Sequence, residues 1–419
     1  MNGQKRSLGK KGSRSITSID GGDPPIEGLN VLMIAPTSFF AGYGGHVRIL
    51  EEALILQKMG HEITICTYHN GQDIEGLTIE RTLSIPWRQD YEVGSSRHKM
   101  AFDTLLFLKS LGVALRKRPN IIHAHIHEGA LIGYPISLLL RIPLIFDLQG
   151  SLTGEMIDHH FLQPDGFFYR PTRVLEEIID HMPAAIITSS QHALNLLRDE
   201  FHCDAELIHI VPDCVKAEFF RPSDDQESKA LLRARLGIPP DRKIVVYLGL
   251  LAEYQGIGLL LEGISRLRQR LLDTHFLIMG FPGVDYYRLR TQQLGIEDQV
   301  TFTGKIPYRE APRYLALGDV AVAPKISDSE GCGKLLNYMA MALPTVAFDT
   351  PVSREYLGDY GIYVERGNSL AFAEAIDSLL RDRDRALELG HRLRQRASRL
   401  YSWEEAGKRI VDIYRSCAA

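Results

Sequence analysis

The chain has 419 residues, too many for one ordinary hydrophobic core, so we expect two domains. Its content of 45% hydrophobic and 24% charged residues is typical of a soluble globular protein. A net charge of −4, without a basic stripe interleaved with aromatic residues, argues against nucleic-acid binding. The five cysteines are too widely spaced for a disulfide framework or a Cys-x-x-Cys zinc site, which favours a reducing cytoplasm.

The first 28 residues are basic and then rich in Ser, Gly and Pro. They lack the apolar core of a secretory signal, and we interpret them as a disordered tail. The most apolar stretch of the chain, GALIGYPISLLLRIPLIF, contains Arg141 and two prolines, which argues against a membrane span. We therefore expect a cytoplasmic protein, either free or at the inner face of the membrane.

From residue 29 onward, apolar runs alternate with helical patterns such as HVRILEEALILQKMG. Continuous Val, Ile and Leu runs are typical of strands buried on both faces, in a parallel sheet with helices outside. The rhythm pauses near residue 215, at CVKAEFFRPSDDQESK, and then begins again. The sequence therefore predicts two doubly wound α/β domains that face each other across a cleft, one over 29–214 and one over 215–398. The expected strands are LNVLMIAP, EITICTY, IIHAHI, PLIFDL, AAIITSS and LIHIVP in the first domain, and KIVVYLGLL, HFLIMGF, VTFTG, VAVAP, PTVAFD and GIYVERG in the second.

Ligands bind such sheets at the carboxyl ends of the strands, so the turns that follow strands are the candidate sites. After the first strand, Gly42, Gly44 and Gly45 precede a long helix, which suits either a bound phosphate or a turn with positive φ. The spacing fails the dinucleotide fingerprint at Val47, and the second strand ends in CTYHN without an acidic residue for a ribose. A nicotinamide oxidoreductase is therefore disfavoured.

Three histidines, His123, His125 and His127, alternate along IIHAHIH, which predicts that they share one face of a strand. Burying imidazoles is unfavourable unless they are hydrogen-bonded. Three interpretations are open: the histidines bind a metal, they are hydrogen-bonded residues of the core, or they line the cleft. No carboxylate or cysteine pattern completes a metal site. We expect His123, deeper in the strand, to belong to the core, and His125 to line the cleft with His127 and Glu128 close by.

The stretch SDSEGCGKLLNYMA begins a helix directly after the strand DVAVAPK, with Glu330, Gly331, Gly333 and Lys334 at its start. Glycines weaken a helix start, and a lysine there opposes the helix dipole. An anionic ligand that approaches the bare backbone accounts for both features. Glu330 has the alternative interpretation of a helix-capping carboxylate.

With these motifs, the chain resembles the glycosyltransferases of family 4, retaining nucleotide-sugar enzymes with the GT-B fold of two Rossmann-like domains. The resemblance runs in order from residue 29 to the end of the chain. It rests on the glycine turn, HAH, IITSS, IVPDCV, YLGLL with YQG, FTGKIPYREAPRYLALGDVAVAP, EGCGKLLNYMAMALPTVAF and the terminal YSWEEAGKRIVDIY. It implies that the final helix, within 399–419, crosses back to the N-terminal domain.

The resemblance also implies that the N-terminal domain binds the acceptor and the C-terminal domain binds the donor, with the diphosphate over the helix that follows the acidic motif. Gly331, Gly333 and Lys334 would then face the phosphates, and Glu330 would face the hydroxyls of the donor sugar. His125 and Glu330 are the catalytic candidates. We expect no metal and no other cofactor, since no Asp-x-Asp motif ends a strand.

Two departures from the family's pattern concern the donor site. The family often has a second Glu that binds the ribose. That spacing gives Tyr338 here, but the segment is one residue shorter, so Asn337 is the better equivalent. Leu250 and Gln255 stand where relatives have an Arg and a Lys for the diphosphate. The chain is therefore either a divergent branch in which Lys334 replaces those cations, or a protein with a defective donor site.

We expect a retaining, hexosyl-type glycosyltransferase that uses a UDP-, GDP- or similar nucleotide-sugar and a hydroxyl acceptor, which is a glycan, a lipid-linked sugar or a small molecule. A non-catalytic binding or scaffold protein of the same fold is the alternative. The segment SIPWRQDYEVGSSRHKM either receives a phosphorylated or lipid-linked acceptor at a membrane surface or is a solvated loop. The expected donor-binding residues are Gly44, Gly45, Gly249, Gln255, Gly331, Gly333, Lys334, Leu335 and Asn337. The residues expected either at the acceptor or behind the residues that contact the ligands are His127, Glu128, Lys325, Arg97 and Lys99.

Overall fold

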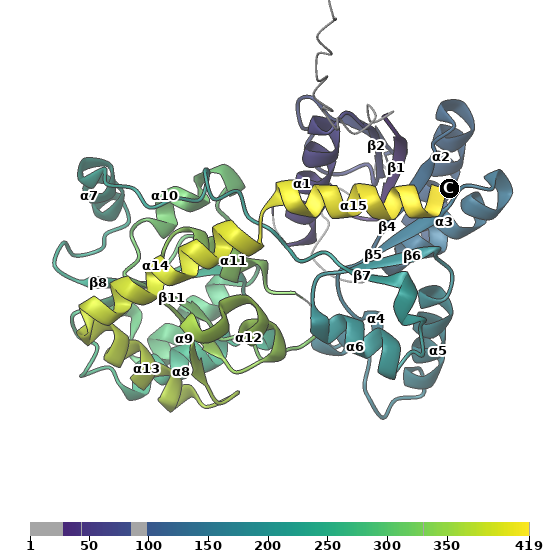
Figure 1. Cartoon of the computed structure of the whole chain (residues 1–419). Helices are drawn as coiled ribbons and strands as arrows, with labels where there is room; N and C mark the ends of the chain where they lie inside the picture. The colour runs from purple at the N-terminus through teal and green to yellow at the C-terminus, as the bar shows by residue number, and fades with distance from the viewer. Residues whose placement is uncertain (1–27, 43, 85–98, 330, 419) are drawn as a thin grey trace, which may run out of the picture.

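The computed structural model describes residues 28–42, 44–84, 99–329 and 331–418. Figure 1 shows two α/β domains side by side. The first domain has a parallel sheet in the order β3-β2-β1-β4-β5-β6-β7, and the second has a parallel sheet in the order β10-β9-β8-β11-β12-β13. The two doubly wound parallel sheets predicted from the sequence are therefore confirmed.

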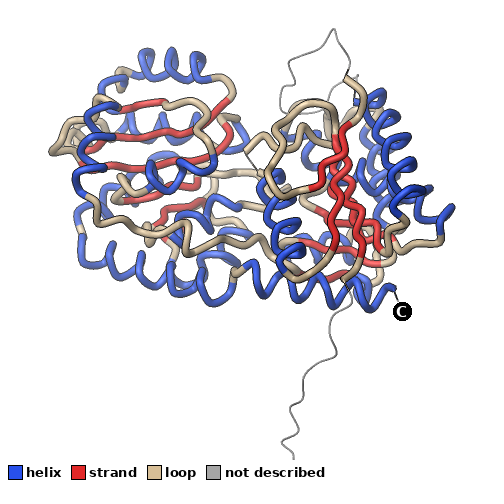
Figure 2. Tube along the Cα trace, turned by 90° about the horizontal axis from the view of Figure 1, so that it is seen from above, coloured by secondary structure: helices blue, strands red, loops and turns tan. Residues whose placement is uncertain are grey.

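In the first domain the strands alternate with helices along the chain, except that β3 follows β2 without a helix, and the helices pack around the sheet (Figure 2). The strands are β1 (Asn30–Ala35), β2 (Glu62–Thr67), β3 (Thr78–Arg81), β4 (Ile121–His125), β5 (Leu144–Leu148), β6 (Ala185–Thr188) and β7 (Ile208–Ile210). The helices are α1 (Gly45–Lys58), α2 (Lys99–Lys117), α3 (Ile126–Leu140), α4 (Leu152–Asp158), α5 (Tyr169–Asp180) and α6 (Gln191–Asp199), with a 3-10 turn η1 (Ala205–Leu207).

The second domain repeats this alternation. Its strands are β8 (Lys243–Leu250), β9 (Thr274–Phe281), β10 (Val300–Phe302), β11 (Val320–Ala323), β12 (Thr345–Phe348) and β13 (Ile362–Val364). Its helices are α7 (Gln226–Arg235), α8 (Ile257–Arg266), α9 (Val284–Leu294), α10 (Ala311–Leu315), α11 (Gly333–Ala340), α12 (Pro351–Leu357), α13 (Ser369–Arg381) and α14 (Arg383–Leu400), followed by α15 (Trp403–Ala418). The 3-10 turns are η2 (Glu253–Gln255), η3 (Glu297–Gln299), η4 (Tyr308–Glu310) and η5 (Gly358–Tyr360).

The apolar runs form strands because the helices cover both faces of the sheet, which leaves no room for an alternating polar face. All five residues of β4 and of β5 are buried. One strand was not predicted: β3, a four-residue strand with no buried residue, lies at the edge of the first sheet. Its sequence, TIER, lacks the apolar run that a central strand carries, so hydrophobicity could not reveal it.

Each sheet has one point where the strand order reverses, and ligands bind doubly wound sheets at such switch points. In the first sheet the reversal lies between β1 and β4, and in the second it lies between β8 and β11. The turns after these strands carry the glycine turn, the histidine motif, the YQG turn and the acidic motif. The topology therefore brings the motifs of each domain to one edge of its sheet.

The last helix leaves the second domain and packs on the first. Figure 1 shows α15, in yellow, extending from α14 across to α1. Trp403, Ile410 and Tyr414 belong to the same hydrophobic core as β1 and β4, and the Tyr414 hydroxyl is hydrogen-bonded to Nδ1 of His123. The most apolar stretch of the chain contributes to α3 and β5, and among the described helices none is long and apolar enough to cross a bilayer.

Candidate functional site

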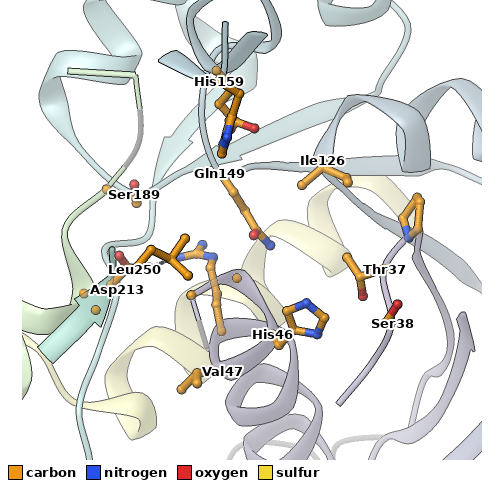
Figure 3. A pocket seen from close by; sticks show the side chains of 18 of the residues that line it. Thr37, Ser38, His46, Val47, Ile126, Gln149, His159, Ser189, Asp213 and Leu250 are labelled. Atoms are coloured by element: carbon orange, nitrogen blue, oxygen red, sulfur yellow. Dashed lines mark hydrogen bonds and ion pairs between the residues drawn. The ribbon is translucent and has the colours of Figure 1, made fainter. Parts of the chain in front are cut away.

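A cavity of about 1260 Å³ lies between the two domains, at the carboxyl ends of the strands that flank both switch points. Its first-domain wall includes the glycine turn and the start of α3, and its second-domain wall includes the ends of β8 and β9 and the start of α11. Figure 3 shows that side chains from both domains, among them Gln149 and Leu250, lie around this space. The cleft expected from the sequence is therefore present.

Most of the expected donor-binding residues line this cavity. Leu335 is the exception, since its side chain is fully buried in the hydrophobic core of the second domain. Successive residues of a helix point in different directions, so the neighbours of a cavity-facing residue turn toward the core. The residues that line the cavity are Gly44, Gly45, Gly249, Gln255, Gly331, Gly333, Lys334 and Asn337. Glu330 lies outside the described residues, as does Arg97 on the acceptor side.

Lys334 reaches back from the first turn of α11 to the YQG turn. Its Nζ donates a hydrogen bond to Oε1 of Gln255 at 2.6 Å, and it lies 3.2 Å from the Tyr247 hydroxyl and 4.5 Å from the centre of the Tyr247 ring. Gly249 makes room for it, because a Cβ on this residue would lie 2.7 Å from the lysine nitrogen. Gly249 also has a φ of 152°, a backbone conformation that residues with a side chain rarely adopt. The second domain thus presents a positioned cation at the carboxyl end of β8.

Asn337 rather than Tyr338 faces the cavity, as the sequence analysis expects. The Tyr338 side chain is fully buried, and its hydroxyl accepts a hydrogen bond from the Leu248 amide at 2.7 Å. This contact ties α11 to β8, which holds the start of the helix beside the YQG turn. The amide of Asn337 is then available to a neutral polar group such as a hydroxyl.

The expectation that His125 lines the cleft is wrong in this structure. His125 is completely buried, and its ring stacks on His123 with 4.5 Å between the centroids. Its Nδ1 lies 3.0 Å from Oδ2 of Asp147. The three histidines do not share one face, because β4 ends at His125 and α3 begins at Ile126, which turns His127 toward the cavity instead. His123 belongs to the core, as expected.

A buried charge network below the glycine turn was not predicted. Arg48 on α1 bridges Asp147 at 2.8 Å, Glu52 at 3.0 Å and Asp213 at 3.0 Å. Burial by itself raises the pKa of the Asp147 carboxyl, but the Arg48 charge and the hydrogen bond to His125 outweigh it and lower that pKa. Asp147 is therefore a buried carboxylate, and Arg48 and Asp213 carry the network up to the cavity wall.

On the acceptor side, His127, Glu128 and Lys99 all line the cavity. Lys99 and Glu128 form a close ion pair, which lowers the pKa of Glu128 against the opposing effect of burial. Lys325 was expected either at the acceptor or behind the residues that contact the ligands, and it is not on the cavity wall. It is buried and its Nζ donates to the Gly331 carbonyl at 3.2 Å, so it supports the loop of the acidic motif from behind.

The comparisons with known proteins agree with this geometry. Residues 43–219 match the protein family described as "Glycosyltransferase Family 4", and residues 228–399 match the family described as "Glycosyl transferases group 1". The chain belongs to the family 4 glycosyltransferases of the GT-B fold.

Individual relatives of this glycosyltransferase are distant. It is 28% identical to an alpha-D-kanosaminyltransferase of Streptomyces kanamyceticus over 70% of the chain and 76% of the relative. It is 23% identical to a D-inositol 3-phosphate glycosyltransferase of Corynebacterium glutamicum over 90% of the chain and 92% of the relative. Among solved structures, Anabaena HepE in complex with UDP-glucose superposes with a TM-score of 0.74 at 16% identity, over 93% of this chain and all of that one.

Among the described residues of the glycosyltransferase, two groups of side chains are close enough together to hold a metal. The first is Glu52, His123, His125 and Asp147, and the second is His127, Glu176 and Asp180. Arg48 already supplies a cation to the first group. In the second, burial lowers the pKa of His127, but the Asp180 carboxyl, 3.3 Å from its Nε2, raises that pKa overall.

Asp103 is a cavity residue that the sequence analysis did not single out. Its carboxyl accepts a hydrogen bond from the Tyr68 hydroxyl. Burial raises the pKa of Asp103 from 3.8 to about 6, although the Tyr68 bond opposes the shift. A charged group on an amphipathic helix carries no sequence signal of this kind, because the burial comes from segments that are distant along the chain.

The raised pKa of Asp103 makes stability depend on pH. A group whose folded pKa is raised stabilises the fold below its unfolded pKa, and this contribution is lost as pH rises through about 6. Asp103→Asn removes the titration. As pH rises from 4 to 7, the free energy of unfolding of the variant should therefore increase relative to that of wild type. Two pKa units with solvent screening correspond to about 1–2 kcal/mol. Urea unfolding at both pH values measures the change, and a difference that is flat with pH would contradict it.

Proposed function

We propose that the chain is a retaining glycosyltransferase that moves a hexosyl group from a nucleoside-diphosphate sugar to a hydroxyl acceptor. The observation that carries this proposal is the meeting of Lys334, Gln255 and Gly249 at the carboxyl end of β8, on the wall of the interdomain cavity. A helix N-terminus with glycines and a lysine suits a diphosphate. The names of the relatives and the UDP-glucose bound to HepE support a nucleotide-sugar as the donor.

In the proposed mechanism, each domain binds one substrate at its own wall of the cavity. The second domain binds the nucleotide-sugar, with Lys334 and the backbone amides of the acidic-motif loop at the diphosphate and Asn337 near a ribose hydroxyl. Negative charge grows on the diphosphate as the sugar leaves, and Lys334 stabilises it. The acceptor hydroxyl approaches from the first domain, and its proton passes to the leaving phosphate.

The state of a cavity carboxylate supports a mechanism without a covalent intermediate. Asp213, beside Gly331, accepts hydrogen bonds from Arg48 at 3.0 Å and from the Tyr356 hydroxyl at 3.3 Å. A carboxylate held in this way is a weak nucleophile, because its charge is already neutralised. We therefore assign Asp213 to positioning rather than to attack on the sugar.

The proposal predicts an α-linked product from an α-linked donor and activity that survives EDTA. The test is to incubate the protein with a panel of UDP- and GDP-sugars and hydroxyl acceptors, to find the product by mass spectrometry and to assign its anomeric configuration by NMR. The same assay is run after EDTA and again after magnesium is restored. An inverted product would contradict retention, and activity abolished by EDTA and restored by magnesium would contradict the metal-free mechanism.

A further inference from the structure

The first-domain half of the cavity is polar at its floor and apolar at its mouth. Thr37, Ser38, His46 and Gln149 line the cavity and are buried or half-buried, and this set is called the floor (Figure 3). Burial, together with the charge of Lys305, lowers the pKa of His46 to about 3, so its imidazole is neutral near pH 7. The floor therefore offers neutral hydrogen-bonding groups, which suit the hydroxyls of an uncharged head group.

The mouth is built from apolar side chains that remain in contact with solvent. Met100 is 77% exposed, Leu131 44%, Phe161 52% and Leu175 42%, and all four line the cavity. They come from α2, α3, the segment after α4, and α5, and these helices pack against one another. Large apolar side chains that wall a cavity and stay exposed indicate a surface that a ligand covers.

Further exposed apolar side chains lie on or next to the same elements. Leu138 on α3 lies two helical turns after Leu131 and therefore on the same helix face. On α5, Val174 and Ile178 flank Leu175. These further side chains, which do not themselves line the cavity, are Leu138 (62% exposed), Leu139 (65%), Phe167 (86%), Phe168 (69%), Val174 (53%) and Ile178 (52%).

The nucleotide of a donor does not account for this apolar mouth. The second domain has its own apolar lining at the ends of β8 and β9 and on the segment after β10, with Leu250, Phe281 and Ile306. Those side chains lie in the same domain as Lys334, where a nucleotide attached to the diphosphate would reach them. The mouth on the first domain is therefore left for the other substrate.

We propose that the acceptor is an amphiphile, with its hydroxyl-bearing head on the polar floor and its apolar chain over the mouth formed by α2, α3 and α5. This inference rests on the proposed function, because it names the class of the acceptor. Covering the mouth removes apolar surface from water, and burial of about two methylene groups already corresponds to tenfold in affinity. Binding should therefore strengthen with the length of the acceptor's chain.

The test compares methyl β-D-glucopyranoside with n-decyl β-D-glucopyranoside by isothermal titration calorimetry, with the decyl compound below its micelle-forming concentration. The two probes have the same head, so their affinity ratio isolates the chain. In wild type the decyl glucoside should bind at least about tenfold more tightly. Leu175→Asp places a charge in the mouth and should reduce that ratio at least about fivefold, and Leu175→Ala, which keeps the surface uncharged, should reduce it less.

Leu231→Asp is the matched control, because Leu231 is 66% exposed on α7 and does not line the cavity. This variant should keep the wild-type ratio. The inference is overturned if the decyl probe does not bind more tightly than the methyl probe, or if Leu175→Asp keeps the wild-type ratio. It is also overturned if sedimentation shows a dimer that Leu175→Asp dissociates, since the mouth would then be covered by a second copy.

This experiment separates the inference from the proposed function, because it uses no donor and measures no turnover. A chain-dependent affinity in a protein that transfers no sugar would contradict the enzymatic proposal and leave the apolar site standing. Sugar transfer without any chain dependence would leave the enzymatic proposal standing and remove the amphiphilic acceptor.

Discussion

Replacing Lys334 by alanine is expected to lower kcat/KM by at least about tenfold with any donor that the protein accepts. The resemblance to family 4 implies that Leu250 and Gln255 stand where an Arg and a Lys would contact the diphosphate, so the proposed mechanism needs another cation there. A hydrogen bond to a charged group contributes roughly 1.5–3 kcal/mol, and about 1.4 kcal/mol corresponds to tenfold in rate. Because the growing charge on the leaving diphosphate is stabilised, kcat should fall as well as kcat/KM.

The structure provides a graded set of controls for Lys334. Gln255→Ala removes the amide oxygen that holds the lysine at 2.6 Å but keeps the charge, so it should lower kcat/KM only a few-fold. Lys334→Arg keeps the charge and should retain more activity than Lys334→Ala. Lys229→Ala, on α7 and outside the cavity lining, should change nothing. Full activity in Lys334→Ala would exclude this lysine as the phosphate ligand.

The pattern of apolar runs was sufficient to predict the two sheets because parallel strands are buried on both faces, so each strand is itself a hydrophobic signal. The same logic failed for β3, whose TIER sequence forms an edge strand without a buried residue. The glycines and Lys334 were found because they contradict local helix preferences, and such conflicts tend to mark functional positions. Leu335 shows the limit of this logic, because the residue next to Lys334 on the helix has its side chain in the core.

The histidine motif shows why the rest could not be predicted. Extending the strand to His127 would place three rings on one face, but the chain switches from strand to helix after His125, and one residue decides where each ring points. The pairing of Arg48 with Asp147 joins residues that are 99 apart along the chain. A charged residue inside the apolar strand PLIFDL was the only available signal for it, and that signal does not name the partner.

Arg48→Met is expected to lower the melting temperature by about 10 °C, the largest stability effect of any single change that we propose. Arg48 is 5% exposed, and Asp147 and Glu52 are fully buried. Removing one partner of a buried pair leaves an uncompensated charge, which costs about 3–5 kcal/mol, and each kcal/mol corresponds to about 2–4 °C for a domain of this size. Differential scanning calorimetry measures the shift. Arg288→Met, which breaks an exposed pair with Asp285, should shift the melting temperature by no more than a few degrees.

A second substitution and the pH dependence separate lost charge pairing from lost packing. Adding Asp147→Asn to Arg48→Met removes the unpaired carboxylate and should recover part of the melting temperature, whereas a packing defect would persist. In wild type, the lowered pKa of Asp147 gives stability that is present above the unfolded pKa and is lost as pH falls. Without Arg48 that contribution disappears, and burial then raises the pKa of Asp147 in the variant. The stability deficit of Arg48→Met should therefore be greatest near pH 7 and shrink toward pH 4, where Asp147 of the variant becomes protonated and neutral. A loss of melting temperature that is equal at both pH values, with no recovery in the double variant, would contradict this account. Arg48 would then stabilise the fold through its packing and not through charge pairing with Asp147.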